Sequence, residues 1–405
     1  MAAKWDKIMA GRDTENAAHV LTNRYTLSST LKLMPNSFML THSHFAPANI
    51  VLQRNVHLWQ IGRDVVKFIQ VDEGVDLYDT LKYPILHLAQ LQNAKCIIYL
   101  PRTIFDTLAS NIDIEKRDIA WLFMTPRCGS TLWGQIFAVL PNWSVINESL
   151  VLYNSTVFEY EIDDVIALTK TQTFEGLVEA YVKWHTLAIP EDHSIFWKGT
   201  ILDHHIIPIL RKKFPHIKIL FGYRDILPSA KSWQKSFGSL PGAEFGNRYI
   251  FSPVMATGCP RNIPEKDCFV FFTNGYNIKT CIEAFKASNG VSAAFEQYMF
   301  IWAAIIAMMK QYKHDGYKIL PMKYEDLIAD RRQTIGRVFD YLDIPAKLID
   351  LSLTAMDRDS QEGLFFDKKT RSKNPSWVRT EDAVRRCNAI LKVFDVGDLD
   401  STTNF

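Results

Sequence analysis

A loop that could bind an oxyanion lies between two apolar runs, residues 120–124 and 132–139. The first run predicts a buried strand and the second a helix. Between them, Gly129 lets the backbone approach a ligand closely, and Ser130 and Thr131 supply hydroxyl groups. The unpaired N–H groups at the start of the helix and the helix dipole act at the same place. This order of residue types predicts an oxyanion site.

The position of the cation distinguishes this loop from that of nucleoside triphosphatases. The latter reads G-x-x-x-x-G-K-[ST], with the lysine directly before the hydroxyl that binds magnesium. Here the cation is Arg127, which precedes Gly129, and Ser130 follows the glycine directly. An ordinary structural turn after a core strand is the alternative interpretation of the loop.

A second candidate anion site follows the apolar run 217–223, which is strand-like. Arg224 ends this run, and Ser232 comes eight residues later on the next expected helix. The guanidinium can donate two hydrogen bonds to one phosphate, and the serine hydroxyl can reach the same group. Because ligands of parallel sheets bind at the carboxyl ends of the strands, Arg127 and Arg224 are expected at one edge.

Both segments resemble the nucleotide-binding motifs of sulfotransferases that use 3′-phosphoadenosine 5′-phosphosulfate (PAPS). The first is similar to the 5′-phosphosulfate loop in its P-R-x-G-[ST]-T form, which occurs in the tyrosylprotein, carbohydrate and bacterial branches. The second is similar to the motif that binds the 3′-phosphate. The resemblance implies that PAPS is held by Arg127, Cys128, Gly129, Ser130, Thr131, Leu132, Arg224 and Ser232.

The same resemblance suggests which residues carry the chemistry. Lys198 is similar to the lysine that follows the second strand of the family and reaches the phosphosulfate; a solvated lysine on a loop is the alternative. The cytosolic branch has a histidine base in K-x-H, but Thr200 occupies that position here. The P-R-x-G branch instead uses a carboxylate, and Glu148 lies 21 residues after Arg127. We therefore expect Arg127, Lys198 and Glu148 to be catalytic, with His204 or His205 as the alternative base.

Two later segments resemble the family more weakly. Tyr324-Glu325-Asp326-Leu327 is similar to a late strand end; Glu325 and Asp326 are expected to cap the helix that starts near Asp330 and to pair with a strand-end arginine. Before it, residues 298–309 predict a buried helix. The basic segment 365–377 resembles a loop that closes over the nucleotide, in which Lys369, Arg371 and Ser372 would bind PAPS; a solvated loop is the alternative.

The expected fold class is α/β, a P-loop-like three-layer sandwich with a mostly parallel sheet in residues 116–405. Residues 1–115 are expected to form an α/β extension that packs on this catalytic domain. Its strands are expected at 56–61, 65–71 and 96–100, and its helices at 83–92 and 103–112. The Gly-, Pro- and Asn-containing stretch 238–277 is expected beside the acceptor site.

Composition limits the other classes of function. The 405 residues are 47% hydrophobic and carry a net charge of +2, so no global field favours nucleic acid. There is no apolar h-region at the start and no run of 18 apolar residues, so no membrane span is expected. Six cysteines without a C-x-x-C pair are expected to be reduced thiols in a cytoplasmic protein. The alternate pair His42 and His44 is expected at the surface, without a metal.

These observations predict transfer of a sulfuryl group from PAPS to a hydroxyl or amine of a small-molecule acceptor, with release of PAP. The acceptor is expected to be an alcohol, phenol or lipid, and no metal cofactor is required. Two alternatives remain open: a sulfotransferase-like protein that binds nucleotide without transfer, and an ATP-dependent phosphotransferase on a P-loop fold. A homodimer is compatible with the sequence.

Overall fold

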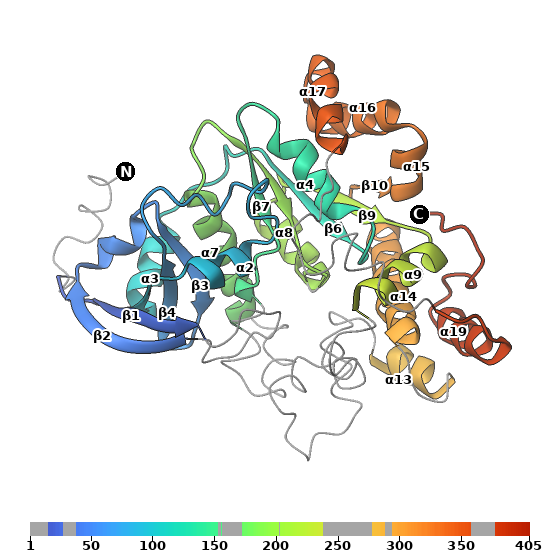
Figure 1. The fold of residues 1–405 in the computed structure, drawn as a ribbon, viewed down its shortest axis with the longest axis horizontal. Coiled ribbons are helices and arrows are strands. Elements are labelled where there is room, and N and C mark those ends of the chain that lie inside the picture. The colour runs from blue at the N-terminus through green and yellow to red at the C-terminus, as the bar shows by residue number, and fades with distance from the viewer. Residues whose placement is uncertain are drawn as a thin grey trace. The chain divides into compact units, whose positions relative to one another are not determined.

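The computed structural model describes residues 15–26, 38–152, 155, 172–201, 203–237, 278–287, 294–357 and 377–405 (Figure 1). The chain divides into two compact units. The first unit comprises Met1–Asp118, Ser144–Ile195 and Lys212–Phe214, and the second comprises Ile119–Trp143, Phe196–Arg211 and Pro215–Phe405. The first unit thus extends past the predicted boundary at residue 115 and takes in two later segments.

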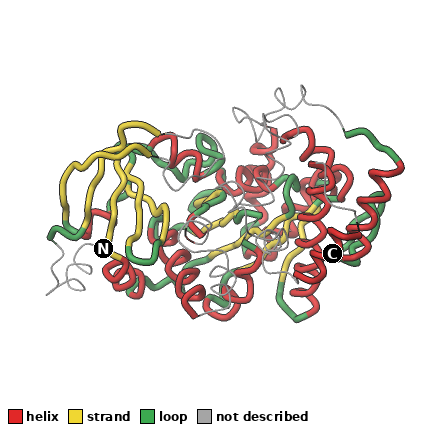
Figure 2. The backbone as a smooth tube through the Cα atoms, turned by 90° about the horizontal axis from the view of Figure 1, so that it is seen from below, coloured by secondary structure: helices red, strands yellow, loops and turns green. Residues whose placement is uncertain are grey.

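The first unit is built on an antiparallel sheet of order β2-β1-β5-β4-β3, drawn in yellow in Figure 2. Its strands are β1 (Ala18–Thr26), β2 (Phe38–Ala46), β3 (Val56–Ile61), β4 (Val65–Gln70) and β5 (Cys96–Pro101). The predicted strands at 56–61, 65–71 and 96–100 are confirmed. The sequence analysis did not predict β1 and β2. In β2 most side chains are exposed, so the strand shows no clean apolar alternation.

Helices cover this sheet through aromatic contacts. Phe68 of β4 and Phe105 of α3 both pack against Trp184 of α7, with ring centres 5.3 and 4.9 Å apart. The helices of the unit are α2 (Leu86–Asn93), α3 (Arg102–Ser110) and α7 (Gln172–Leu187), with a 3₁₀ turn, η1 (Ala48–Leu52). The helices predicted at 83–92 and 103–112 are confirmed, with ends shifted by a few residues.

A five-stranded parallel sheet carries the predicted anion motifs, and its order is β10-β9-β6-β8-β7. Its strands are β6 (Ile119–Met124), β7 (Trp143–Asn147), β8 (Ser194–Lys198), β9 (Lys218–Tyr223) and β10 (Ile319–Lys323). Strand β9 pairs in parallel with both β6 and β10. The predicted α/β class with a parallel sheet is therefore confirmed.

Both faces of this sheet are covered. Successive side chains of a strand point to opposite faces. On one face, Phe196 of β8 stacks on Phe137 of α4, with ring centres 3.9 Å apart. On the other face, the rings of Trp197 and of Trp121 in the neighbouring strand β6 stack with centres 4.1 Å apart, and both are fully buried. The remaining helical elements of the described residues are α4 (Ser130–Ala138), η2 (His204–Ile206), α8 (Ile207–Lys213), α9 (Ile226–Phe237), α13 (Ile278–Ala287), α14 (Ala294–His314), α15 (Tyr324–Ala329), α16 (Arg331–Leu342), η3 (Ala346–Leu348), α17 (Ile349–Thr354), η4 (Ala355–Asp357) and α19 (Glu381–Val393).

The predicted buried helix is α14, which packs against α9 and α19 (Figure 1). It is longer than the apolar run 298–309, and the side chains of that run are buried apart from a half-exposed Ala307. No helix within the described ranges combines the length and the hydropathy that a membrane crossing requires. Among the described cysteine side chains, Cys96, Cys128 and Cys387 form no disulfide.

The predicted cap of the helix near Asp330 is wrong. Asp330 itself caps α16, since its carboxylate accepts a hydrogen bond from the Gln333 amide at 2.9 Å. Glu325 and Asp326 instead lie in the first turn of α15. The reason is that α15 begins directly after β10 without a loop, so these two residues are already helical.

A buried histidine in the first unit makes stability depend on pH. Burial lowers the pKa of His57, in β3, to about 4. The unfolded chain, with a histidine pKa of about 6.5, therefore binds more protons between pH 6.5 and 4, and the free energy of unfolding falls as the pH drops through this window. We expect His57→Phe to remove up to about 3 kcal/mol of this loss in denaturant titrations. His314→Phe, at a side chain that is 85% exposed, is the control; an unchanged pH slope in His57→Phe would contradict the assignment.

Candidate anion site at the carboxyl ends of β6, β8 and β9

The first motif forms the predicted strand, tight turn and helix. Strand β6 ends at Met124, and α4 begins at Ser130 with Gly129 as its N-cap. Arg127 and Gly129 both have positive φ, 62° and 82°. The left-handed conformation of these two residues makes the turn tight, so that α4 begins at the residue after Gly129. The turn therefore has the geometry of an anion-binding loop.

Lys198 lies beside this loop. Its side chain is fully buried at the end of β8, and Nζ donates a hydrogen bond to Thr131 Oγ1 at 3.1 Å. Because side chains alternate along a strand, Lys198 lies on the same face as Phe196, which is the face covered by α4. The alternative of a solvated lysine is therefore wrong, whereas contact of Lys198 with a phosphosulfate stays a prediction.

The two predicted anion motifs meet through one hydrogen bond. Arg127 Nε donates to Ser232 Oγ at 3.1 Å. Arg127 belongs to the loop after β6, and Ser232 lies on α9, the helix that follows β9. Because β6 and β9 are parallel neighbours, their carboxyl ends bring the two segments to one edge of the sheet. The expected meeting of the motifs is thus confirmed in geometry.

Arg224 directly follows β9 and is held by α15. Its guanidinium carbon lies 4.4 Å from the ring centre of Tyr324, and Nε lies 3.6 Å from a Glu325 carboxylate oxygen. The same carboxylate is 3.4 Å from the amide nitrogen of Asp225. The predicted pairing of Glu325 with a strand-end arginine is confirmed.

Two residues of α14 that the sequence analysis did not identify donate hydrogen bonds to the backbone of the two arginine segments. The Tyr298 hydroxyl donates to the Pro126 carbonyl at 2.7 Å, and Trp302 Nε1 donates to the Arg224 carbonyl at 3.1 Å. Burial raises the pKa of Tyr298, so its hydroxyl stays protonated and can donate. The two residues are four apart, so they share one face of the helix. The sequence did contain a signal for these contacts, because a buried tyrosine hydroxyl or tryptophan N–H in an apolar helix usually has a hydrogen-bond partner.

The Cys128 side chain belongs to the core. It is 1% exposed, and a Cβ added to Gly222 of β9 would lie 3.2 Å from its sulfur. Burial raises the pKa of the thiol to about 11, against the opposing charges of Lys198 and Arg224. Its part in holding a ligand is therefore confined to its backbone.

Glu148 directly follows β7, the edge strand of the parallel sheet, and belongs to the first unit. Its φ is 50°, and its carbonyl oxygen lies 3.2 Å from Nδ1 of His87. The side chain is half-buried. The role of Glu148 as a base stays a prediction.

His204 does not suit the role of a base. It is fully buried, its ring packs against Phe123 of β6, and burial lowers its pKa to about 3. Before it, Asp203 accepts a hydrogen bond from the Thr200 amide at 2.6 Å, which closes the turn after β8. A histidine with so low a pKa is a weak base near neutral pH.

Some predicted contacts lie outside the described residues. These are Lys369, Arg371 and Ser372, together with the whole stretch 238–277. Trp377, at the end of the basic segment, stacks on Phe295 of α14 with ring centres 4.0 Å apart. Within the described ranges, no group of three His, Cys, Asp or Glu side chains is arranged to hold a metal ion.

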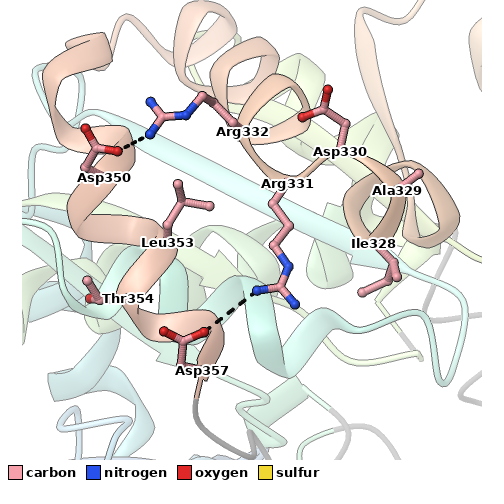
Figure 3. Close-up of a pocket in the computed structure, with 9 residues that line it drawn as sticks. All are labelled: Ile328, Ala329, Asp330, Arg331, Arg332, Asp350, Leu353, Thr354 and Asp357. Carbon is pink, nitrogen blue, oxygen red and sulfur yellow. Dashed lines mark hydrogen bonds and ion pairs between the residues drawn. The ribbon is translucent and has the colours of Figure 1, made fainter.

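A separate depression of about 560 Å³ lies between α15, α16 and α17 (Figure 3). Its arginines are already paired: Arg331 with Asp357 at 3.8 Å, and Arg332 with Asp350. None of the anion-motif residues lines it. We therefore place the candidate site at the strand ends and not in this depression.

No family model matches the chain, and no curated protein matches it. Similar solved structures include the sulfotransferase domain from the curacin biosynthetic pathway. The two sequences are 13% identical and the TM-score is 0.34; the alignment covers 64% of this chain and 84% of that domain. Another is the sulfotransferase domain from the Synechococcus PCC 7002 olefin synthase, which is 14% identical with a TM-score of 0.35. This alignment covers 67% of this chain and 94% of that domain.

Gly129→Ala tests the loop geometry. A Cβ there would lie 2.5 Å from the Tyr324 ring, in a left-handed backbone. Gly316→Ala is the matched control, because Gly316 also has positive φ but nothing lies within 4 Å of the added Cβ. Each variant should lose roughly 1–2 kcal/mol of stability through backbone strain. Calorimetry should show loss of PAP binding in Gly129→Ala alone, and equal binding in both variants would contradict the proposed loop.

Proposed function

We propose that this chain is a sulfotransferase that transfers the sulfuryl group of PAPS to a hydroxyl or amine of a small-molecule acceptor and releases PAP. The observation that carries the proposal is the Arg127–Ser232 hydrogen bond. It joins a phosphosulfate-type loop to a 3′-phosphate-type motif at one sheet edge. A nucleotide with anionic groups at both its 3′ and 5′ positions requires two such neighbouring motifs.

The donor set suits PAPS. Arg224 and Ser232 supply a guanidinium and a hydroxyl for the 3′-phosphate. Lys198 and Arg127, with the start of α4, supply charge and N–H groups for the phosphosulfate. The Lys198 ammonium lies beside Thr131 in the first turn of α4, so an anion bound at this helix start would be within its reach.

These residues can also act on the reaction itself. The acceptor oxygen or nitrogen forms a bond to sulfur, while the bond from sulfur to the bridging phosphate oxygen breaks and leaves its electron pair on PAP. Lys198 and Arg127 would stabilise the negative charge that develops on the bridging oxygen. Glu148 would accept the proton of the acceptor. His204 is not used in this scheme, because burial lowers its pKa to about 3 and makes it a weak base.

Nucleotide selectivity tests the proposal. Thermal-shift titrations of the full chain with PAP, 5′-AMP, and ATP plus magnesium should give the largest stabilisation with PAP. Arg224→Ala should remove the preference for PAP over 5′-AMP, because the two differ in the 3′-phosphate. A preference for ATP with magnesium would favour the phosphotransferase alternative, and equal responses to PAP and 5′-AMP would contradict the proposal.

Arg127→Ala should abolish transfer of labelled sulfate from PAPS while the protein stays folded. The reason is that the arginine charge acts at the loop and not in the core. Arg127→Lys should retain part of the activity, because it keeps the positive charge. Arg385→Ala, which removes an exposed arginine on α19, is the control. Near-normal turnover in Arg127→Ala with any acceptor in the panel would remove this residue from the mechanism.

Glu148→Gln separates binding from chemistry. If Glu148 is the base, the variant should bind PAP like the wild type and lose roughly 10²–10⁴-fold in turnover. The loss should be smaller with phenols than with aliphatic alcohols, because a phenol gives up its proton more readily. Glu115→Gln, at an exposed position, serves as the control. Unchanged turnover with an aliphatic alcohol would exclude Glu148 as the base.

A further inference from the structure

Tyr324 contacts both anion motifs, although it belongs to neither. It is the first residue of α15 and directly follows β10. A Cβ placed on Gly129 would lie 2.5 Å from its ring atom Cδ2. The guanidinium carbon of Arg224 lies 4.4 Å from the centre of the same ring. One aromatic ring therefore packs against the loop glycine and against the arginine of the second motif.

Other contacts fix how Arg224 lies on this ring. Glu325 faces the Nε edge of the guanidinium at 3.6 Å, and Trp302 holds the backbone of Arg224 through its carbonyl. A guanidinium carries five N–H donors in one rigid plane. With the guanidinium carbon over the Tyr324 ring and Nε toward Glu325, the position of the group is set, and its terminal nitrogens can donate to a phosphate.

We propose that Tyr324 is a positioning residue that presets Arg224 for the 3′-phosphate and at the same time supports Gly129 of the phosphosulfate loop. The inference rests on the proposed function. The negative face of the ring attracts the guanidinium, most strongly where water is partly excluded. An arginine that is already oriented loses less conformational freedom when it binds. Selectivity for a nucleotide with a 3′-phosphate is therefore partly a property of Tyr324.

The shared ring also explains why only glycine fits the loop. Any side chain at position 129 would displace the Tyr324 ring, and with it the surface on which Arg224 rests. The two motifs are therefore coupled through a third side chain, in addition to the direct Arg127–Ser232 bond.

The test compares the ratio of the 5′-AMP and PAP dissociation constants in ring variants, measured by calorimetry on the full chain. Tyr324→Phe keeps the ring and should stay within about threefold of the wild-type ratio, whereas Tyr324→Leu should lower it by about tenfold. Tyr25→Leu is the matched control, because Tyr25 is 64% exposed in the first unit. In an Arg224→Ala background, Tyr324→Leu should cause no further loss of the ratio.

Ring-fluorinated phenylalanines at position 324 provide a second test if Tyr324→Leu does not fold, because they keep the shape of the ring. Each added fluorine weakens the negative face, so the ratio should fall stepwise. If the wild type prefers PAP but the ratio is unchanged along this series and in a folded Tyr324→Leu, the inference is overturned and the proposed function stands. If the wild type does not prefer PAP, the proposed function itself fails.

Discussion

The hydrogen bond from Arg127 to Ser232 is the interaction on which the rest of the site depends. It can form only because β6 and β9 are parallel neighbours, so that the loop after one and the helix after the other begin at the same edge. An antiparallel pair would place these segments at opposite ends. The topology of the sheet thus brings together two anion motifs that are about a hundred residues apart in the sequence.

Concentrating cations at one edge has a cost that the surrounding residues reduce. Like charges repel, and the buried Lys198 has lost most of its contact with water. Glu325 supplies a nearby negative charge, and the Tyr324 ring supplies a favourable surface for Arg224. Tyr298 and Trp302 of helix α14 donate hydrogen bonds to the backbone carbonyls of Pro126 and Arg224. The site is therefore supported before any ligand arrives, which lowers the entropic cost of binding.

The sequence predicted the parts of the fold that depend on local pattern. The strand before the first loop, the glycine turn and the helix after it combine apolar periodicity with a residue that tolerates positive φ, and both signals are local. Strand β2 was missed because its side chains are mostly exposed. The roles of Tyr298, Trp302 and Tyr324 were missed because they depend on contacts between distant segments, which periodicity does not encode.

A crystal structure with PAP tests the central claim most directly, because it shows whether the two motifs form one nucleotide site. The account predicts the 3′-phosphate within hydrogen-bonding distance of Arg224 and Ser232. It predicts the 5′-phosphate at the turn of Gly129 and the start of α4, close to Lys198. PAP bound elsewhere, or with its phosphates away from both motifs, would contradict the account.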